Sequence, residues 1–227
     1  MTPPAIEESL LAAEAAVDAG RGLSGTGFWR AVASVKREPE LIDRYADRIA
    51  AIDLAAFEQW ALVKMPVSWG TALMALATAV GVGLVGWSYY TTGELISVVL
   101  FYLGLGVLLV TTHGLAHLLI GSALGMRFTH WFIGKITQPQ PGVKVDYSTY
   151  LRARAVNRAW MHAGGAITTK LIPFALIGAA VAADLPRWAV WGLPVIGVAA
   201  IITDIVWSTR NSDWKKFRRE MKFAQTP

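Results

Sequence analysis

The chain has 227 residues, of which 54% are hydrophobic and ten are tryptophan, so its composition excludes an ordinary soluble domain of this length. The absence of cysteine excludes disulfides, thiolate metal ligands and cysteine nucleophiles. The net charge of +5 predicts attraction to anionic lipid. Nucleic acid is a poor alternative, because the basic residues flank the apolar segments and the long polar N-terminal region is acidic.

Residues 1–65 form that polar region. Ile6 to Ala19 has helical composition, the glycine-rich Gly20 to Gly27 interrupts it, and apolar residues recur at helical spacing after Glu38. We therefore expect a cytoplasmic, amphipathic helical region that leads into the first membrane span. The sequence leaves two roles open for it: a docking surface for a partner, or a cap that packs on its own protein.

Four apolar segments are each close to the roughly 20 residues that cross the hydrocarbon core of a bilayer. They predict an all-α integral membrane protein with four transmembrane helices in residues 66–208, followed by a basic tail in residues 209–227. Tryptophans near the ends of the segments favour this interpretation, because indole rings prefer the membrane interface. The predicted spans are Pro66 to Tyr90, Leu95 to about Gly125, Met161 to Ala183, and Trp188 to Ser208.

The distribution of basic residues predicts the orientation. They concentrate in the connection between the second and third spans and in the tail, whereas the other two connections carry only Arg187. Because basic residues favour the cytoplasmic side, we expect a multi-pass protein with both termini in the cytoplasm. The tail cluster is most simply a lipid-facing anchor; it comprises Lys215, Lys216, Arg218 and Arg219.

Two histidines lie within the second span. His113 and His117 are four residues apart, so they share one helix face and can hold one metal ion. Asp204 lies at a similar depth in the fourth span, and an ionised carboxylate in lipid requires a compensating cation or donor. His113, His117 and Asp204 are therefore the predicted metal ligands, with zinc the expected ion and an open fourth position.

These segments resemble the site-2 protease family of intramembrane zinc metallopeptidases over about residues 95 to 220. His113-Gly-Leu-Ala-His117 corresponds to the family's His-Glu-x-x-His helix, and Arg127 to Tyr147 corresponds to its membrane-associated β-hairpin. Ala163 to Thr168 corresponds to its Gly-Pro-x-x-Asn-like segment, and Thr203-Asp204-Ile205 corresponds to its Leu-Asp-Gly motif. The resemblance implies this fold and a zinc site with Asp204 as the third ligand.

The departures from that pattern concern activity. Gly114 stands where the family has its general-base glutamate, and loss of such a base costs orders of magnitude in rate. We therefore expect a degenerate, non-catalytic relative that binds or assists another membrane protein. An active intramembrane zinc peptidase is the alternative, and a third class is an electron-transfer subunit with haem between His113 and His162.

Two further residues have open roles. Asp204 can instead form an ion pair with Lys170, a charged residue about halfway along the third span. His162, at the cytoplasmic start of that span, is either a fourth ligand, a proton carrier or an interfacial histidine in contact with headgroups. These two residues complete the candidate site.

Overall fold

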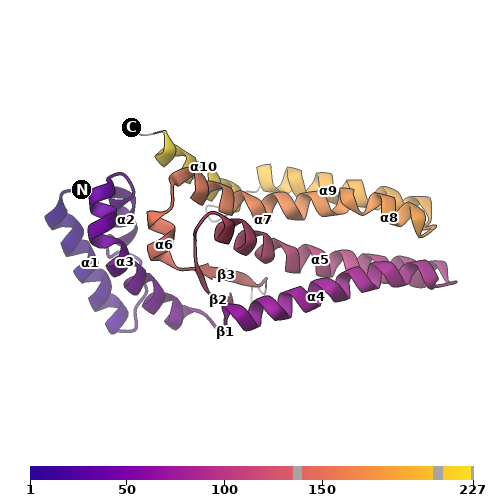
Figure 1. Ribbon diagram of the computed structural model, residues 1–227, viewed down its shortest axis with the longest axis horizontal. Coiled ribbons are helices and arrows are strands. Elements are labelled where there is room, and N and C mark those ends of the chain that lie inside the picture. Colours follow the sequence, from indigo (N-terminus) through magenta and orange to yellow (C-terminus); the bar gives the residue numbers. More distant parts are fainter. Residues whose placement is uncertain (135–139, 207–211, 226–227) are drawn as a thin grey trace.

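The structure is a computed structural model that describes residues 1–134, 140–206 and 212–225. It is mostly helical, as expected, with a helical N-terminal region, a small sheet and a long helical bundle arranged along one axis (Figure 1). Parts of the predicted hairpin (135–139), of the fourth span (207–208) and of the tail (209–211 and 226–227) lie outside the described residues.

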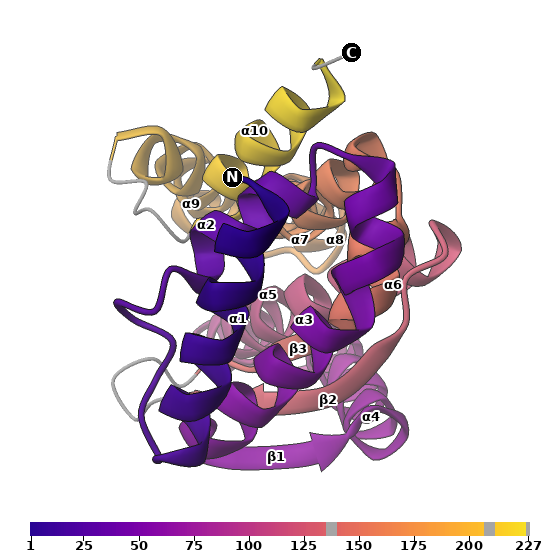
Figure 2. The same cartoon turned by 90° about the vertical axis from the view of Figure 1, so that its left-hand side faces the viewer.

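The N-terminal region folds as three helices around its own apolar core. Prolines at the first helical positions start α1 (Pro3–Asp18) and α3 (Pro39–Trp60), where a missing N–H has no cost. A further helix that was not predicted from the sequence, α2 (Phe28–Val35), begins directly after the glycine-rich segment and precedes α3. The core of the N-terminal region includes the fully buried Ile6, Phe28 and Ile49. Figure 2 shows these helices at the end of the molecule.

Four helical segments of the described chain are long and apolar enough to cross a membrane, which confirms that expectation by length and composition. Neighbours in the bundle are α4 with α5, α5 with α7, and α7 with α9. Large apolar side chains are exposed on the outside of the bundle, among them Trp69, Leu76 and Trp191. The helices are α4 (Val67–Trp87, extended by the 3-10 turn Ser88–Tyr90), α5 (Glu94–Ala123), α7 (Ala155–Ala175) with α8 (Ile177–Ala182), and α9 (Arg187–Val206).

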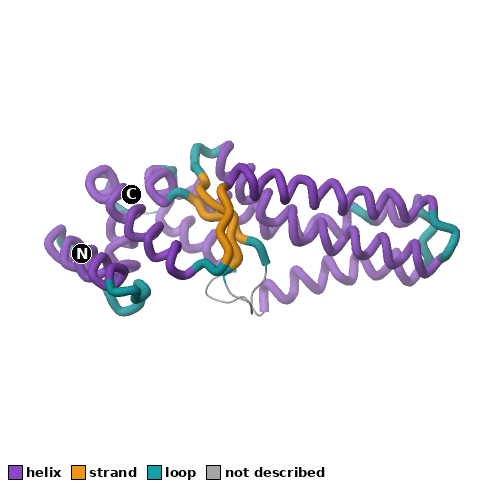
Figure 3. Tube along the Cα trace, turned by 90° about the horizontal axis from the view of Figure 1, so that it is seen from below, coloured by secondary structure: helices purple, strands orange, loops and turns teal. Residues whose placement is uncertain are grey.

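A three-stranded antiparallel sheet lies between the N-terminal helices and the bundle (Figure 3). The expected hairpin is present as β2 (Phe128–Ile133) and β3 (Gly142–Val145). The sequence analysis did not anticipate the third strand, β1 (Val63–Pro66), which pairs with β2 from Val63 opposite Ile133 to Pro66 opposite His130. This pairing joins the start of the first span to the hairpin.

Two short helices complete the fold at the same end as the sheet. Asp146 caps α6 (Tyr147–Arg152) by accepting a hydrogen bond from the backbone N–H of Ser148. Ser212 caps α10 (Asp213–Ala224) in the same way. α10 packs against α7 through a face that includes the completely buried Glu220. Three of the four residues of the expected lipid-facing cluster are exposed: Lys215, Arg218 and Arg219. Both chain termini lie near this end of the molecule (Figure 1).

Candidate metal centre

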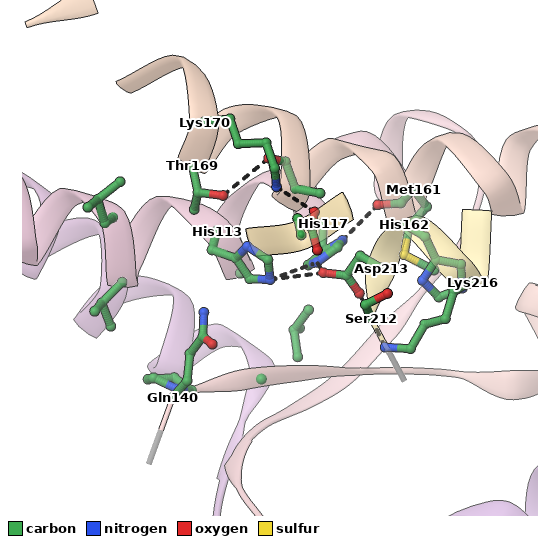
Figure 4. A pocket seen from close by; sticks show the side chains of 18 of the residues that line it. His113, His117, Gln140, Met161, His162, Thr169, Lys170, Ser212, Asp213 and Lys216 are labelled. Carbon is green, nitrogen blue, oxygen red and sulfur yellow. Dashed lines mark hydrogen bonds and ion pairs between the residues drawn. The ribbon is translucent and has the colours of Figure 1, made fainter. Parts of the chain in front are cut away.

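The two histidines of α5 point toward one another at the wall of a cavity (Figure 4). Their spacing of four residues brings their Nε2 atoms to 3.2 Å from each other. His117 is 9% exposed, and its ring packs directly on Gly165 of α7. A Cβ atom at position 165 would collide with that imidazole, so the glycine is what allows α7 to approach the histidine this closely.

The carboxylate beside these histidines belongs to Asp213, the first residue of α10. Its Oδ2 atom lies 3.1 Å from Nε2 of His113 and 3.2 Å from Nε2 of His117. Burial favours the neutral form of Asp213, but hydrogen bonding with the two imidazoles outweighs it and holds the pKa of the carboxyl well below its ordinary value. A negatively charged oxygen therefore faces both imidazole nitrogens.

A backbone carbonyl fixes the tautomer of His117. Its Nδ1 atom lies 2.7 Å from the carbonyl oxygen of Met161, and because a carbonyl can only accept, Nδ1 donates a proton to it. In the neutral imidazole, Nε2 then carries a lone pair directed at the oxygen of Asp213. A proton on one of the imidazoles or a metal ion can bridge these atoms. Metal-binding histidines usually have such a backbone partner.

The separations among the three ligand atoms match a tetrahedral zinc site. Zinc bonds of about 2.0–2.1 Å place neighbouring ligand atoms of a tetrahedron about 3.3 Å apart. The three observed separations are 3.1, 3.2 and 3.2 Å. Within the described residues, His113, His117 and Asp213 are the group of histidine and acidic side chains that can hold a metal ion.

Asp204 was the predicted third ligand, and it is not a member of that group. Its Oδ2 atom instead lies 2.7 Å from Nζ of Lys170, which is the ion pair that the sequence analysis left open. Lys170 also donates a hydrogen bond to the backbone carbonyl of Ala166. Each charge in the pair compensates the other, so Asp204 needs no metal ion at its position.

His162 lies in the same region but has a different partner. Its Nε2 atom is 2.9 Å from the hydroxyl of Tyr150, which lies on α6. The imidazole of His113 is directed at Asp213 instead. His162 also lines the cavity, but it is not a member of the group formed by His113, His117 and Asp213.

The three ligands line a cavity of about 1060 Å³ that extends to both residues of the ion pair. Its wall combines apolar side chains with polar groups, including Gln140, Thr169, Lys170 and Lys216 (Figure 4). No glutamate is among the described residues that line it. The centre thus has three protein ligands and open space beside them.

An indole ring occupies the space next to Gly114. A Cβ atom at position 114 would lie 2.5 Å from Cζ3 of Trp131, which is 4% exposed. Trp131 also packs on Gly70 of α4, and its Nε1 donates a hydrogen bond of 3.0 Å to the hydroxyl of Thr71. The ring is therefore held between α4 and α5, directly beside position 114.

The sequence analysis missed Asp213, although the sequence holds two signals for its position. Ser212 followed by Asp213 is a typical helix start, and Trp214, Phe217 and Glu220 then recur at helical spacing. Together they predict an amphipathic helix whose first turn carries an acidic residue. They do not predict that this helix folds back against α7, because that contact is non-local.

Comparison of the chain with protein-family models, with curated proteins and with solved structures finds no match.

Proposed function

We propose that the protein is a multi-pass membrane metalloprotein that holds zinc with His113, His117 and Asp213 and binds a segment of another membrane protein at that site. The observation that carries this proposal is the convergence of three potential ligand atoms at 3.1–3.2 Å from one another, with the Nε2 atom of His117 left free of a proton by the hydrogen bond that its Nδ1 donates to Met161 in the neutral ring. When bound, zinc supplies Lewis acidity to whatever group takes the open fourth position.

The chemistry of the ligands favours zinc over other common ions. Two imidazoles and one carboxylate suit zinc, whereas calcium and magnesium prefer oxygen ligands alone. Haem is poorly supported, because His113 and His117 converge on one point and the Nε2 atom of His162 is engaged by Tyr150. The tautomer enforced by Met161 leaves His117 ready to bind the ion without losing a proton.

The scaffold is that of a site-2-protease-like protein in this proposal. Paired histidines on the second span, the following β-hairpin and a carboxylate near the C-terminal end of the bundle support it. Asp213 replaces Asp204 as the carboxylate that completes the ligand set, nine residues further along the chain. The third ligand in this proposal is therefore still an aspartate, as in the resembled family, but it is not the aspartate that corresponds to the Leu-Asp-Gly motif.

Binding is better supported than hydrolysis. Zinc-dependent proteolysis needs a base beside the metal, and Gly114 has no side chain to supply one. The indole of Trp131 lies where a side chain at position 114 would begin, so a residue with a Cβ atom would collide with it. Of the other carboxylates, Asp204 is engaged by Lys170, and Glu94 lies at the opposite end of the 30-residue helix α5.

The membrane setting is part of the same proposal. The exposed apolar faces of α4 and α9 fit contact with lipid chains, and basic residues at the sheet end of the bundle fit attraction to anionic headgroups. Both termini and the metal centre would then face the cytoplasm. Substituted cysteines report this directly, because the native chain has none: Thr92→Cys should react with an impermeant reagent outside intact cells, and Gln225→Cys should not.

Metal analysis combined with a cleavage assay tests the function. Protein purified from membranes should carry about one zinc per chain and show no haem absorption. Reconstituted with single-span candidate substrates, it should bind some of them without cleaving any. Cleavage that His113→Ala abolishes would contradict the binding role and favour an active peptidase.

A further inference from the structure

A second buried cluster of charges lies on α10, away from the metal centre. Glu220 is completely buried, and its two carboxylate oxygens have separate basic partners. Oε1 lies 2.6 Å from Nζ of Lys36, and Oε2 lies 2.7 Å from Nε of Arg158. The side chains of both partners are also buried, with exposures of 6% and 2%.

This cluster joins four helices from distant parts of the chain. Lys36 ends α2 of the N-terminal region, Arg158 lies on α7, and Glu220 lies on α10. Arg158 also donates hydrogen bonds to the backbone carbonyls of Leu151 and Ala153, at the end of α6. The ammonium group of Lys36 lies 4.8 Å from the ring centroid of Tyr150 on the same helix.

Such a cluster fixes where α10 can lie. Removing one partner of a buried charge group leaves an uncompensated charge, so sliding or rotating the helix would be costly. Buried ionic groups are best known for setting register in this way. Asp213 and Glu220 are seven residues, or two helical turns, apart, and so lie on the same face of α10.

From this geometry we infer that Lys36 and Arg158 position Asp213 at the metal centre by anchoring Glu220. They are positioning residues, because neither contacts the proposed ion. Since Lys36 belongs to the N-terminal region, that region contributes to metal affinity as well as covering the end of the bundle. The inference rests on the proposed zinc site and names the part of the chain that supports it.

The test measures zinc affinity of the full chain in lipid nanodiscs by competition with a chelator. Lys36→Met keeps the apolar stem of the side chain and leaves Arg158 to compensate Glu220, so the variant should still fold. Its zinc affinity should fall about tenfold, as is typical when a group that supports a ligand is lost. Arg48→Met is the matched control: Arg48 pairs with Glu7 and Glu14 inside the N-terminal region and does not contact α10, so affinity should change less than about twofold.

A double-mutant cycle separates positioning from general loosening of the structure. In an Asp213→Ala background, where the two histidines retain weak zinc binding that a low-affinity chelator measures, Lys36→Met should cause no further loss of zinc affinity, because its effect acts through Asp213. An equal loss in both backgrounds, or unchanged affinity in Lys36→Met alone, would overturn the inference while leaving the zinc site intact. A wild-type chain that binds no zinc would instead overturn the proposed function, and this role of Lys36 with it.

Discussion

Two aspartates line one cavity and have different partners. Asp204 on α9 pairs with the ammonium of Lys170 at 2.7 Å, and this pair is complete in itself. Asp213 on α10 faces two imidazole nitrogens at 3.1 and 3.2 Å, and the lone pair of His117 is directed at it. The difference teaches that burial of a carboxylate does not identify a metal ligand. Asp213 also has a cationic partner, because its Oδ1 atom lies 3.2 Å from Nζ of Lys216. What distinguishes Asp213 from Asp204 is that its second oxygen, Oδ2, converges with two imidazole nitrogens.

The largest expected effect follows from removing a ligand. His117→Ala should lower zinc affinity by at least about a hundredfold. Loss of a residue that only supports a ligand typically lowers metal affinity about 10- to 100-fold, and loss of the ligand itself should lower it further. His162→Gln is the matched control in the same cavity and should retain zinc within about threefold. Chelator competition on the purified protein measures both. Equal losses in the two variants would mean that the histidines act as a group, against the assignment of three ligands.

Breaking the ion pair should affect stability and leave zinc binding unchanged. Lys170→Met leaves Asp204 charged without a partner, which should lower the free energy of unfolding by about 2 kcal/mol, less than for a fully buried pair because both side chains are about a quarter exposed. Lys170→Met combined with Asp204→Leu should recover part of that loss. Denaturant or thermal unfolding in detergent, in the presence of chelator, checks this. A fall in zinc content of the double variant would show that the two aspartates are not independent.

The crowding at Gly114 predicts a difference between two glycines of α5. Gly114→Ala should destabilise the protein by about 1–2 kcal/mol, because the new methyl group meets the held indole of Trp131. Gly106→Ala is the control on the same helix: nothing lies within 4 Å of its position, so its effect should stay within about 1 kcal/mol in either direction. Similar effects at both positions would remove the argument that Trp131 blocks a base at position 114.

The smallest expected effect concerns pH and the anchoring cluster. Burial of Glu220 favours its neutral form, but Lys36 and Arg158 together hold its pKa below the ordinary value of 4.5. Its contribution to stability is therefore present above pH 4.5 and is lost as the pH falls through the lower pKa of the folded state, by at most about 1.4 kcal/mol per pH unit. Glu220→Gln should be less stable at pH 7 and show a shallower loss in acid. Parallel curves for the two proteins would contradict the depressed pKa.

The features that depend on local pattern could be predicted from the sequence. Long apolar segments predicted the four long helices, helical composition predicted α1, and apolar residues at helical spacing predicted α3. Strand β1 could not be predicted, because four residues with an exposed pattern become a strand only by pairing with β2. The histidine pair was readable because both residues share one helix face.

The third ligand was not readable for a physical reason. The position of Asp204 along its span predicts a depth in the membrane similar to that of the histidines. It does not predict which cation pairs with the carboxylate. Asp213 reaches the histidines only because the basic tail forms α10 and folds back on α7, and the buried contacts of Glu220 that hold it there join α10 to α2 and α7. Contacts between residues this far apart in the chain leave no periodic signal.

Zinc content after exchange of each aspartate tests the central claim most directly. Asp213→Asn and Asp204→Asn remove the same charge from the same cavity, so they form a matched pair for metal analysis of purified, chelator-washed protein. The account predicts about one zinc per chain in the wild type and in Asp204→Asn, and essentially none in Asp213→Asn. Zinc that persists in Asp213→Asn but disappears in Asp204→Asn would contradict it.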